Sequence, residues 1–324
     1  MIYPPEGIII NSASNRAYLK SPDDLERAYR EGAVLESIAE VCTQSHDLIT
    51  ALPKMRGIMP REEVSIGIRE GTTKEIAIIS RVGRPVCFTI EGFELLGGER
   101  VAMLSRRSAQ KRCIDEYLLS LRSGEVIDAA VTHIERFGCF VDIGLGIPSM
   151  IPINEISISR ISSPADRFAV GDRIKVIYKG YRDDKFYIGH KELLGTWLEN
   201  AELFSPGETV KGIVRSVEEY GVFVELMPNL AGLAEPDGKI SSESLSPGQP
   251  VSVYIKSINP EKMKVKLIIV AAGEAVEDKS AGEDFLDRTR GGYFITSGRI
   301  KSWRYSPAGC QRLIMSAFDD KTEA

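Results

Sequence analysis

The sequence predicts a mainly β protein, built from small five-stranded closed barrels in tandem, joined by short helices and followed by a C-terminal hairpin. Two observations predict this class. Two segments of about 70 residues repeat one another, and each contains several short strands without a helix between them. A chain of 324 residues also has room for two or three domains.

The repeat is visible in the residues themselves. GEVIDAAVTHIERFGCFVDI begins at Gly124 and GETVKGIVRSVEEYGVFVEL begins at Gly207, an offset of 83 (207 minus 124). Apolar residues alternate along the first strand of each copy, and a glycine turn leads into the second strand. A later strand, AVGDRIKVIYKG or SPGQPVSVYIKS, is offset by only 77 (248 minus 171), so the second copy has a shorter loop. We assign the copies to residues 122–193 and 205–270.

A weaker copy is predicted over residues 31–112. EGAVLESIAEVCTQSHDLITAL suits an opening hairpin, and RVGRPVCFTIEGFELLGGERVAMLSRR suits the last strands. Its turn reads Ser45-His46-Asp47 and lacks the aromatic residues of the other copies. We expect LPKMRGIMPREEV to be a turn region whose methionines either form an adaptable protein-binding surface or pack beneath the loop.

The remaining segments follow from helix and turn signals. Residues 1–30 contain a short helix capped by Ser21, with Pro22 in its first turn. Connecting helices are predicted at SRRSAQKRCIDEYLLSL and LLGTWLENAELF. Residues 271–324 are read as an acidic linker and then a hairpin whose Trp303 and Tyr305 form a small apolar cluster.

Outward-facing aromatic side chains distinguish the two clear copies. If the alternating apolar residues of the second strand face the core, Phe140 and Phe223 face outward together with Asp142 and Glu225. An aromatic ring on a wet face has two explanations, local packing or stacking on an unpaired base. Its recurrence in both copies favours stacking, and for Tyr187 alone the two remain equal. The candidate RNA-binding residues are Phe137, Phe140, Lys185, Tyr187, Lys211, Arg215, Tyr220, Phe223, Lys262 and Lys264.

Composition excludes several other classes. The net charge of −5 means that any RNA contact must come from local patches. The five scattered cysteines have no CxxC pair, and the three histidines have no metal-ligand spacing, so neither a metal nor a cofactor is expected. No nucleotide loop or nucleophile elbow occurs, so we expect no enzyme. Without a membrane-spanning apolar run or a signal peptide, a cytoplasmic protein is expected.

The two copies resemble the S-one RNA-binding repeat, the OB-fold barrel of the bacterial small-subunit ribosomal protein S-one family. The motifs that carry the resemblance are GEVIDAAV, FGCFV and VGDRIKV in the first copy, and GETVKGIV, YGVFV and PGQPVSV in the second. The resemblance implies that the turn and strand aromatics and a basic residue of the last strand, Lys185 or Lys262, form the binding face. The family's histidine on the third strand is replaced by Pro152 and Glu235.

The resemblance also implies a function. We expect a monomeric, non-catalytic, bacterial protein that binds single-stranded RNA, namely mRNA, together with the small ribosomal subunit in translation. Two alternatives remain at this stage. One is a regulatory RNA-binding protein that is not stably on ribosomes, and the other is a protein-interaction scaffold that has lost RNA binding. The weak copy over residues 31–112 is expected to contact protein rather than RNA.

Overall fold

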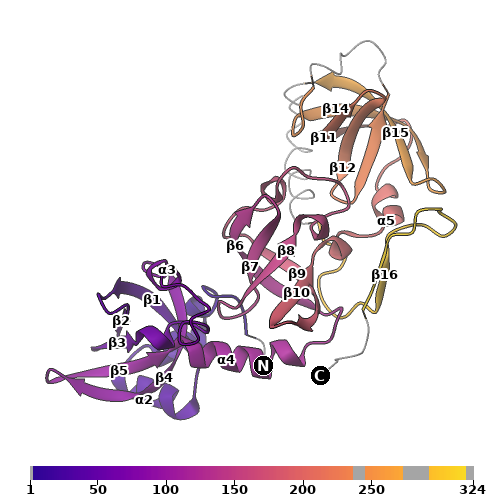
Figure 1. Cartoon of the computed structure of the whole chain (residues 1–324). Coiled ribbons are helices and arrows are strands. Elements are labelled where there is room, and N and C mark those ends of the chain that lie inside the picture. The colour runs from indigo at the N-terminus through magenta and orange to yellow at the C-terminus, as the bar shows by residue number, and fades with distance from the viewer. Residues whose placement is uncertain (1–2, 236–244, 273–291, 319–324) are drawn as a thin grey trace. The chain divides into compact units, whose positions relative to one another are not determined.

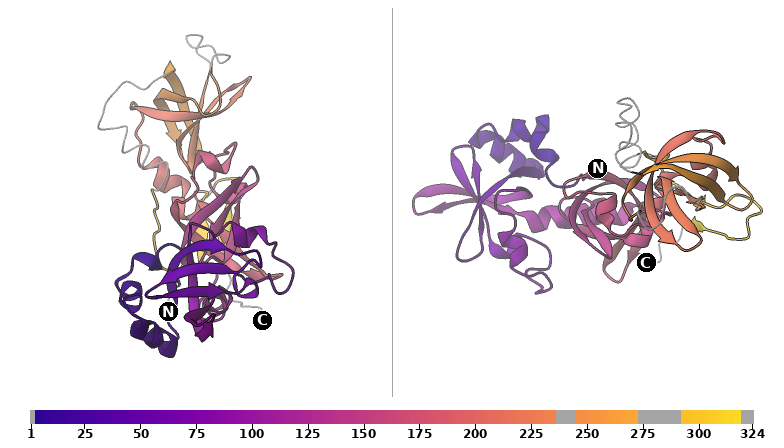
Figure 2. Two further views of the ribbon diagram at one scale, coloured as in Figure 1. Left: turned by 90° about the vertical axis from the view of Figure 1, so that its left-hand side faces the viewer. Right: turned by 90° about the horizontal axis from the view of Figure 1, so that it is seen from above.

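The structure, a computed structural model, describes residues 3–235, 245–272 and 292–318, and it is mainly β. Three five-stranded closed barrels follow one another along the chain. Their strands are drawn in Figures 1 and 2. The predicted fold class of tandem OB-fold barrels is confirmed. Contacts divide the chain into two compact units. The first comprises residues 1–121, 128–130 and 142–148, and the second comprises residues 122–127, 131–141 and 149–324.

The first barrel has the strand order β1-β2-β3-β5-β4. Its strands are β1 Leu35–Cys42, β2 Leu48–Leu52, β3 Met55–Met59, β4 Pro85–Leu96 and β5 Glu99–Ser105. Three short helices accompany it, α1 Ala13–Tyr18, α2 Pro22–Glu31 and α3 Ile76–Ile79. Ser21 caps α2 as expected, because its side chain accepts a hydrogen bond from the Asp24 amide. The fully buried Leu25 joins α2 to the barrel core.

The prediction that LPKMRGIMPREEV forms a turn region is wrong. Residues 55–59 form strand β3, paired with β2 and in parallel with β5. Met59 is fully buried in the core and Met55 packs against it. These methionines fill the barrel interior, so they do not form an exposed protein-binding surface.

The second and third barrels correspond to the two clear sequence copies. The second has the order β10-β8-β7-β6-β9 and the third has the order β11-β12-β13-β15-β14. The strands of the second are β6 Val126–Glu135, β7 Gly138–Asp142, β8 Pro148–Pro152, β9 Arg173–Arg182 and β10 Lys185–Gly189. Those of the third are β11 Thr209–Glu218, β12 Gly221–Met227, β13 Leu230–Ala234, β14 Pro250–Asn259 and β15 Lys264–Ala272.

The connecting segments are helical, with one difference from expectation. α4 spans Arg106–Glu116 after the first barrel, capped by Ser105. The segment predicted as one helix before the third barrel is divided by Gly195, whose φ is +80°, and only α5 Trp197–Ala201 follows. Thr196 and Glu199 form a capping box at its start. Single-turn 3-10 helices lie at Ile9–Asn11, Arg61–Glu63, Leu118–Ser120, Ile153–Glu155, Pro164–Asp166 and Lys191–Leu194.

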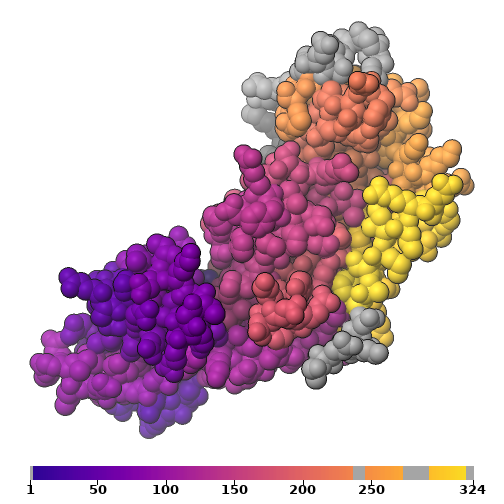
Figure 3. All heavy atoms as spheres, viewed as in Figure 1, coloured from indigo at the N-terminus to yellow at the C-terminus, as the bar shows by residue number. Residues whose placement is uncertain are grey.

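Residues 292–318, here called the C-terminal strap, contain the expected hairpin as β16 Ser302–Arg304 and β17 Met315–Ala317. Trp303 and Tyr305 are buried, with ring centroids 5.7 Å apart, as expected. The expected acidic linker falls largely on residues 273–291, outside the described residues. Figure 3 shows the strap, in yellow, lying against the barrels of the second unit. It therefore belongs to the folded body of that unit.

The strap contacts both barrels of its unit. The Ile300 amide donates to Gly124 O at 2.9 Å in the second barrel. The Tyr305 hydroxyl donates to Asn229 O at 2.6 Å in the third. Gly124 has a φ of +91°, and a Cβ there would lie 1.9 Å from Ile300 O, so the glycine permits this close approach.

Candidate nucleic-acid interface

The same aromatic pair occurs on the second and third barrels. Phe137 and Phe140 are 6.2 Å apart between ring centroids with planes at 86°, and Tyr220 and Phe223 are 6.1 Å apart at 86°. The turn rings are the more open, with Phe137 57% exposed and Tyr220 63% exposed. Edge-to-face packing leaves one face of each turn ring in solvent. The rings thus have a fixed geometry on the outer surface.

A glycine places each pair. β7 begins at Gly138 and β12 at Gly221, immediately after the turn aromatic. A Cβ on either glycine would lie 2.7 Å from a backbone oxygen of the next strand, Ile151 O or Ala234 O. Only glycine allows the two strands to approach this closely beside the ring.

On the second barrel, two further predicted residues join the aromatic pair. Tyr187 on β10 lies beside Met150 of the neighbouring parallel strand β8. Lys185, two positions earlier on the same strand, shares its face. The guanidinium of Arg182 lies 4.8 Å above the Tyr187 ring. Sequence reasoning missed Arg182, and only its contact with the ring reveals it.

On the third barrel, the basic positions differ from the prediction. Lys266, not Lys264, takes the place of Tyr187. Lys266 lies beside Leu233 on β13, just as Tyr187 lies beside Met150 on β8. Lys264 takes the place of Lys185, at the start of the strand. Lys262 lies in the turn before β15, where its amide donates to Asn259 Oδ1. The prediction that Lys262 sits on the last strand is therefore wrong, because this turn is two residues longer than its counterpart.

Lys211 and Arg215 do not join the face as predicted. Lys211 lies five residues along β11 from Ser216, roughly 16 Å at the rise of a strand. Arg215 is mostly buried and makes a two-pronged ion pair with Glu225, at 2.7 and 3.1 Å. Arg167, from the loop before β9, binds the same carboxylate at 2.5 Å. Arg215 is therefore held between the barrels.

Asp142, at the equivalent position of the second barrel, is also covered. Its Oδ1 accepts the amides of Gly144 and Gly146, and its Oδ2 accepts the Glu6 amide at 2.7 Å. Burial and the nearby Glu6 raise the pKa of Asp142 to about 6. Both outward carboxylates thus bind other chain segments and are not available to a ligand.

The position of the S-one family's third-strand histidine holds a different residue in each barrel. Pro152 ends β8. Glu235, directly after β13, pairs with Lys266 at 3.1 Å, and this bond lowers the pKa of the carboxyl. The acid thus neutralises one of the lysines on the face of the third barrel.

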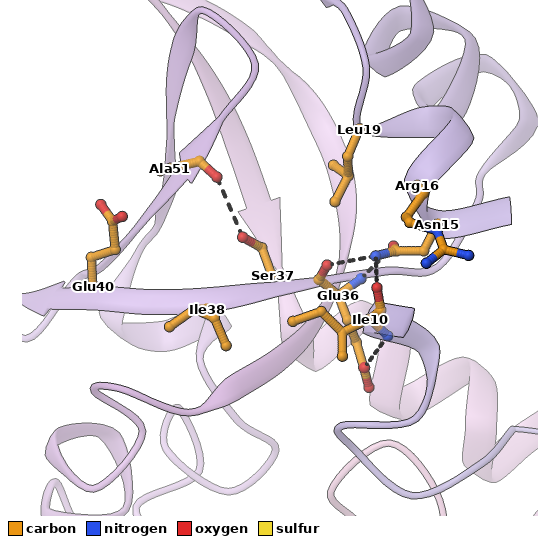
Figure 4. Close-up of a pocket in the computed structure, with 9 residues that line it drawn as sticks. All are labelled: Ile10, Asn15, Arg16, Leu19, Glu36, Ser37, Ile38, Glu40 and Ala51. Atoms are coloured by element: carbon orange, nitrogen blue, oxygen red, sulfur yellow. Dashed lines mark hydrogen bonds between the residues drawn. The ribbon is translucent and has the colours of Figure 1, made fainter. Parts of the chain in front are cut away.

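A pocket of about 540 Å³ lies elsewhere, on the first barrel between α1 and β1. Figure 4 shows Asn15 bonded to Glu36 O and Ser37 bonded to Ala51 O at its rim. Burial raises the pKa of Glu36 to about 7, although the Gly7 and Ile10 amides donate to it. None of these residues belongs to an aromatic face.

The residues that the structure describes lack two further features. No helix among these residues is long and apolar enough to cross a membrane. Among the described residues, no group of three or more His, Cys, Asp or Glu side chains comes close enough together to hold a metal ion.

The second and third barrels each match a known family of RNA-binding domains. Residues 120–191 match the S1 RNA binding domain, and residues 204–267 match the RRP5 S1 domain. Both barrels are therefore S-one domains, and the chain is a tandem S-one-domain protein of the RNA-binding class. The resemblance inferred from the motifs is confirmed.

Curated relatives are ribosomal proteins. The chain is 32% identical over 202 residues to the small ribosomal subunit protein bS1 of Staphylococcus saprophyticus, covering 58% of this chain and 50% of that protein. It is 31% identical over 179 residues to bS1 of Leuconostoc lactis, covering 52% and 40%. The chain thus spans half or less of these relatives. An uncharacterised protein from Methanocaldococcus jannaschii, of solved structure, is 29% identical over 21% of this chain and 93% of its own, with a TM-score of 0.20.

Proposed function

We propose that the chain binds single-stranded RNA on the aromatic faces of its two S-one barrels and acts on mRNA in translation, at the small ribosomal subunit. The observation that carries the proposal is the edge-to-face pair, repeated with the same geometry in both barrels. Exposed rings beside cations are the chemistry that stacks unpaired bases and holds phosphates. The ribosomal relatives support the translational role.

The test removes one ring from each barrel. Phe140→Ala together with Phe223→Ala should weaken binding of an unstructured RNA by about 2–4 kcal/mol, measured by fluorescence anisotropy, because each loses a stacking surface. Both rings are only half-buried, so the melting temperature should change little. Tyr29→Ala is the matched control, since Tyr29 and Phe93 form a similar edge-to-face pair, 5.9 Å apart, on the first barrel.

Wild-type affinity in the double variant would exclude the aromatic faces as the RNA site. A large loss of stability would show that the rings act as core. An RNA hairpin stem should bind more weakly than an unstructured strand, because a duplex hides its base faces.

The ribosomal part of the proposal has its own test. The protein should co-sediment with small ribosomal subunits at low salt and dissociate as salt rises, since charged contacts to RNA are screened. RNA binding without co-sedimentation would favour a regulatory RNA-binding protein. Failure to bind RNA at all, with the fold intact, would favour a protein scaffold.

A further inference from the structure

The face of the second barrel contains a row of side chains that runs across four strands. His133 on β6 lies beside Phe140 on β7, with ring centroids 6.1 Å apart and planes tilted by 38°. Thr132 Oγ1 donates to Phe140 O at 3.2 Å, which ties the two strands together at this level. On the far side, Met150 of β8 is the partner of Tyr187 on β10. The row thus reads imidazole, phenyl, thioether and phenol.

The third barrel has the same row with different chemistry. Ser216 is the cross-strand partner of Phe223, Phe223 of Leu233, and Leu233 of Lys266. Ser216 stands where the second barrel has His133, 83 residues earlier (216 minus 133). Only one of the four positions carries a ring. The stacking area of this row is therefore much smaller.

The charges around the two rows also favour RNA binding by the second barrel over the third. Arg136 is exposed in the turn beside Phe137, whereas Glu219 occupies that position beside Tyr220. Arg182 lies over Tyr187 and makes no ion pair with the residues that the structure describes. On the third barrel, Lys266 is already paired with Glu235. Free cations favour phosphate, and a neighbouring acid opposes it.

His133 is accessible to a ligand. Its side chain is 62% exposed, and its Nε2 lies 2.8 Å from Glu135 Oε1. That bond fixes the edge of the imidazole. An imidazole held beside a phenyl ring extends the flat surface on which a base can stack.

We infer that the second barrel is the principal RNA site of the chain and that His133 and Arg182 are RNA-contact residues that complete it. His133 widens the platform of Phe140. Arg182 covers Tyr187 and supplies a cation for a base or a phosphate. The inference rests on the proposed function, and it assigns to the third barrel a weaker, accessory contact.

The experiment uses the full chain and an unstructured RNA of about 10 nucleotides, within the range that one OB fold covers. His133→Ala and Arg182→Ala should each weaken binding roughly 5- to 30-fold, as the loss of one stacking partner does. His133→Phe, which keeps a ring, should remain close to wild type. Phe140→Ala should weaken binding more than Phe223→Ala does.

The third barrel provides a gain-of-function control. Ser216→His should increase affinity, because a ring is added beside Phe223, whereas Tyr29→Ala on the first barrel should leave it unchanged. The melting temperature of each variant shows whether the fold is intact. If His133→Ala and Arg182→Ala bind as wild type while Phe140→Ala is weakened, this inference is wrong and the proposed function stands. If Phe140→Ala and Phe223→Ala both bind as wild type, the proposed function is wrong as well.

Discussion

Asp142 and Glu225 occupy the same position in the two S-one barrels, 83 residues apart (225 minus 142). Both side chains project from the outer face of their barrel, yet both are buried. Asp142 receives the Glu6 amide from the N-terminal segment. Glu225 receives Arg167 from the preceding barrel. Strand alternation correctly predicts that these side chains point away from the barrel interior. Whether a ligand can reach them depends on which other segments of the chain cover them.

The ion pairs at Glu225 give a prediction for single residues. Glu225→Ala should destabilise the second unit by about 3–5 kcal/mol, because Arg167 and Arg215 would keep buried charges without their carboxylate. Urea unfolding measures the change. Lys211→Ala, on the same strand but without a buried ion pair, should alter stability by less than about 0.5 kcal/mol. Equal effects of the two variants would contradict the assignment.

The β9–β10 and β14–β15 hairpins show how turns set the register of the functional strands. The first turn has two residues, Asp183 and Asp184, with φ of 49° and 56°. The second turn is longer, spans residues 260–263 and ends at Met263, with φ of 48°. The first therefore resembles a type I′ turn, which accepts Asp at its first central position and favours Gly at the second, where this chain has Asp184. Because the turns differ, simple alignment misplaces the lysines of β15 by two positions.

The strap is held against the second barrel by a chain of hydrogen bonds. The Lys175 amide donates to the Tyr293 hydroxyl at 3.1 Å, and Tyr293 lies 3.2 Å from His190 Nε2. His190 Nδ1 donates to Ile156 O at 2.7 Å, so Nε2 is the acceptor. Burial lowers the pKa of His190 to about 4. The neutral imidazole is thus part of the docking of the strap.

This element gives a pH prediction. The folded pKa of His190 lies below its ordinary value of 6.5, so the unfolded chain binds the proton more readily. Its contribution to stability is complete above pH 6.5 and is lost as the pH falls towards 4. The loss should reach about 3 kcal/mol. Thermal unfolding between pH 4 and 7 measures it. His190→Gln should flatten this part of the profile, and an unchanged slope would exclude His190 as the source.

Within the second unit, one buried cluster connects the core of the third barrel with the strap, with α5 and with a residue of the second barrel. Ile177 of the second barrel, Trp197 of α5 and Val253 of the third barrel belong to the same buried cluster as Trp303 and Phe318 of the strap. Such a cluster links the folding of parts that are far apart in the sequence. The strap is therefore a structural part of the unit that contains both S-one domains.

Fragments test this arrangement at the level of the whole chain. Residues 122–324 should retain most of the RNA affinity and melt cooperatively. Residues 122–270 should be markedly less stable, since the partners of Trp303 and Tyr305 become exposed. Residues 1–121 should bind RNA weakly, because the first turn has Ser45 and Asp47 where the other barrels have aromatic rings. RNA titration and calorimetry provide the two measurements. Tight RNA binding by residues 1–121 would contradict the division of roles.

The sequence alone determined the three barrels, the tandem repeat and the paired aromatics. These features depend on strand alternation, glycine turns and residue spacing, which are local properties of the chain. The tertiary structure decided which outward residues remain open to a ligand. It placed Arg215 in a buried ion pair, brought His133 beside Phe140 and packed the strap into a shared core. These contacts join residues on different strands or in distant segments, so spacing along the sequence does not reveal them.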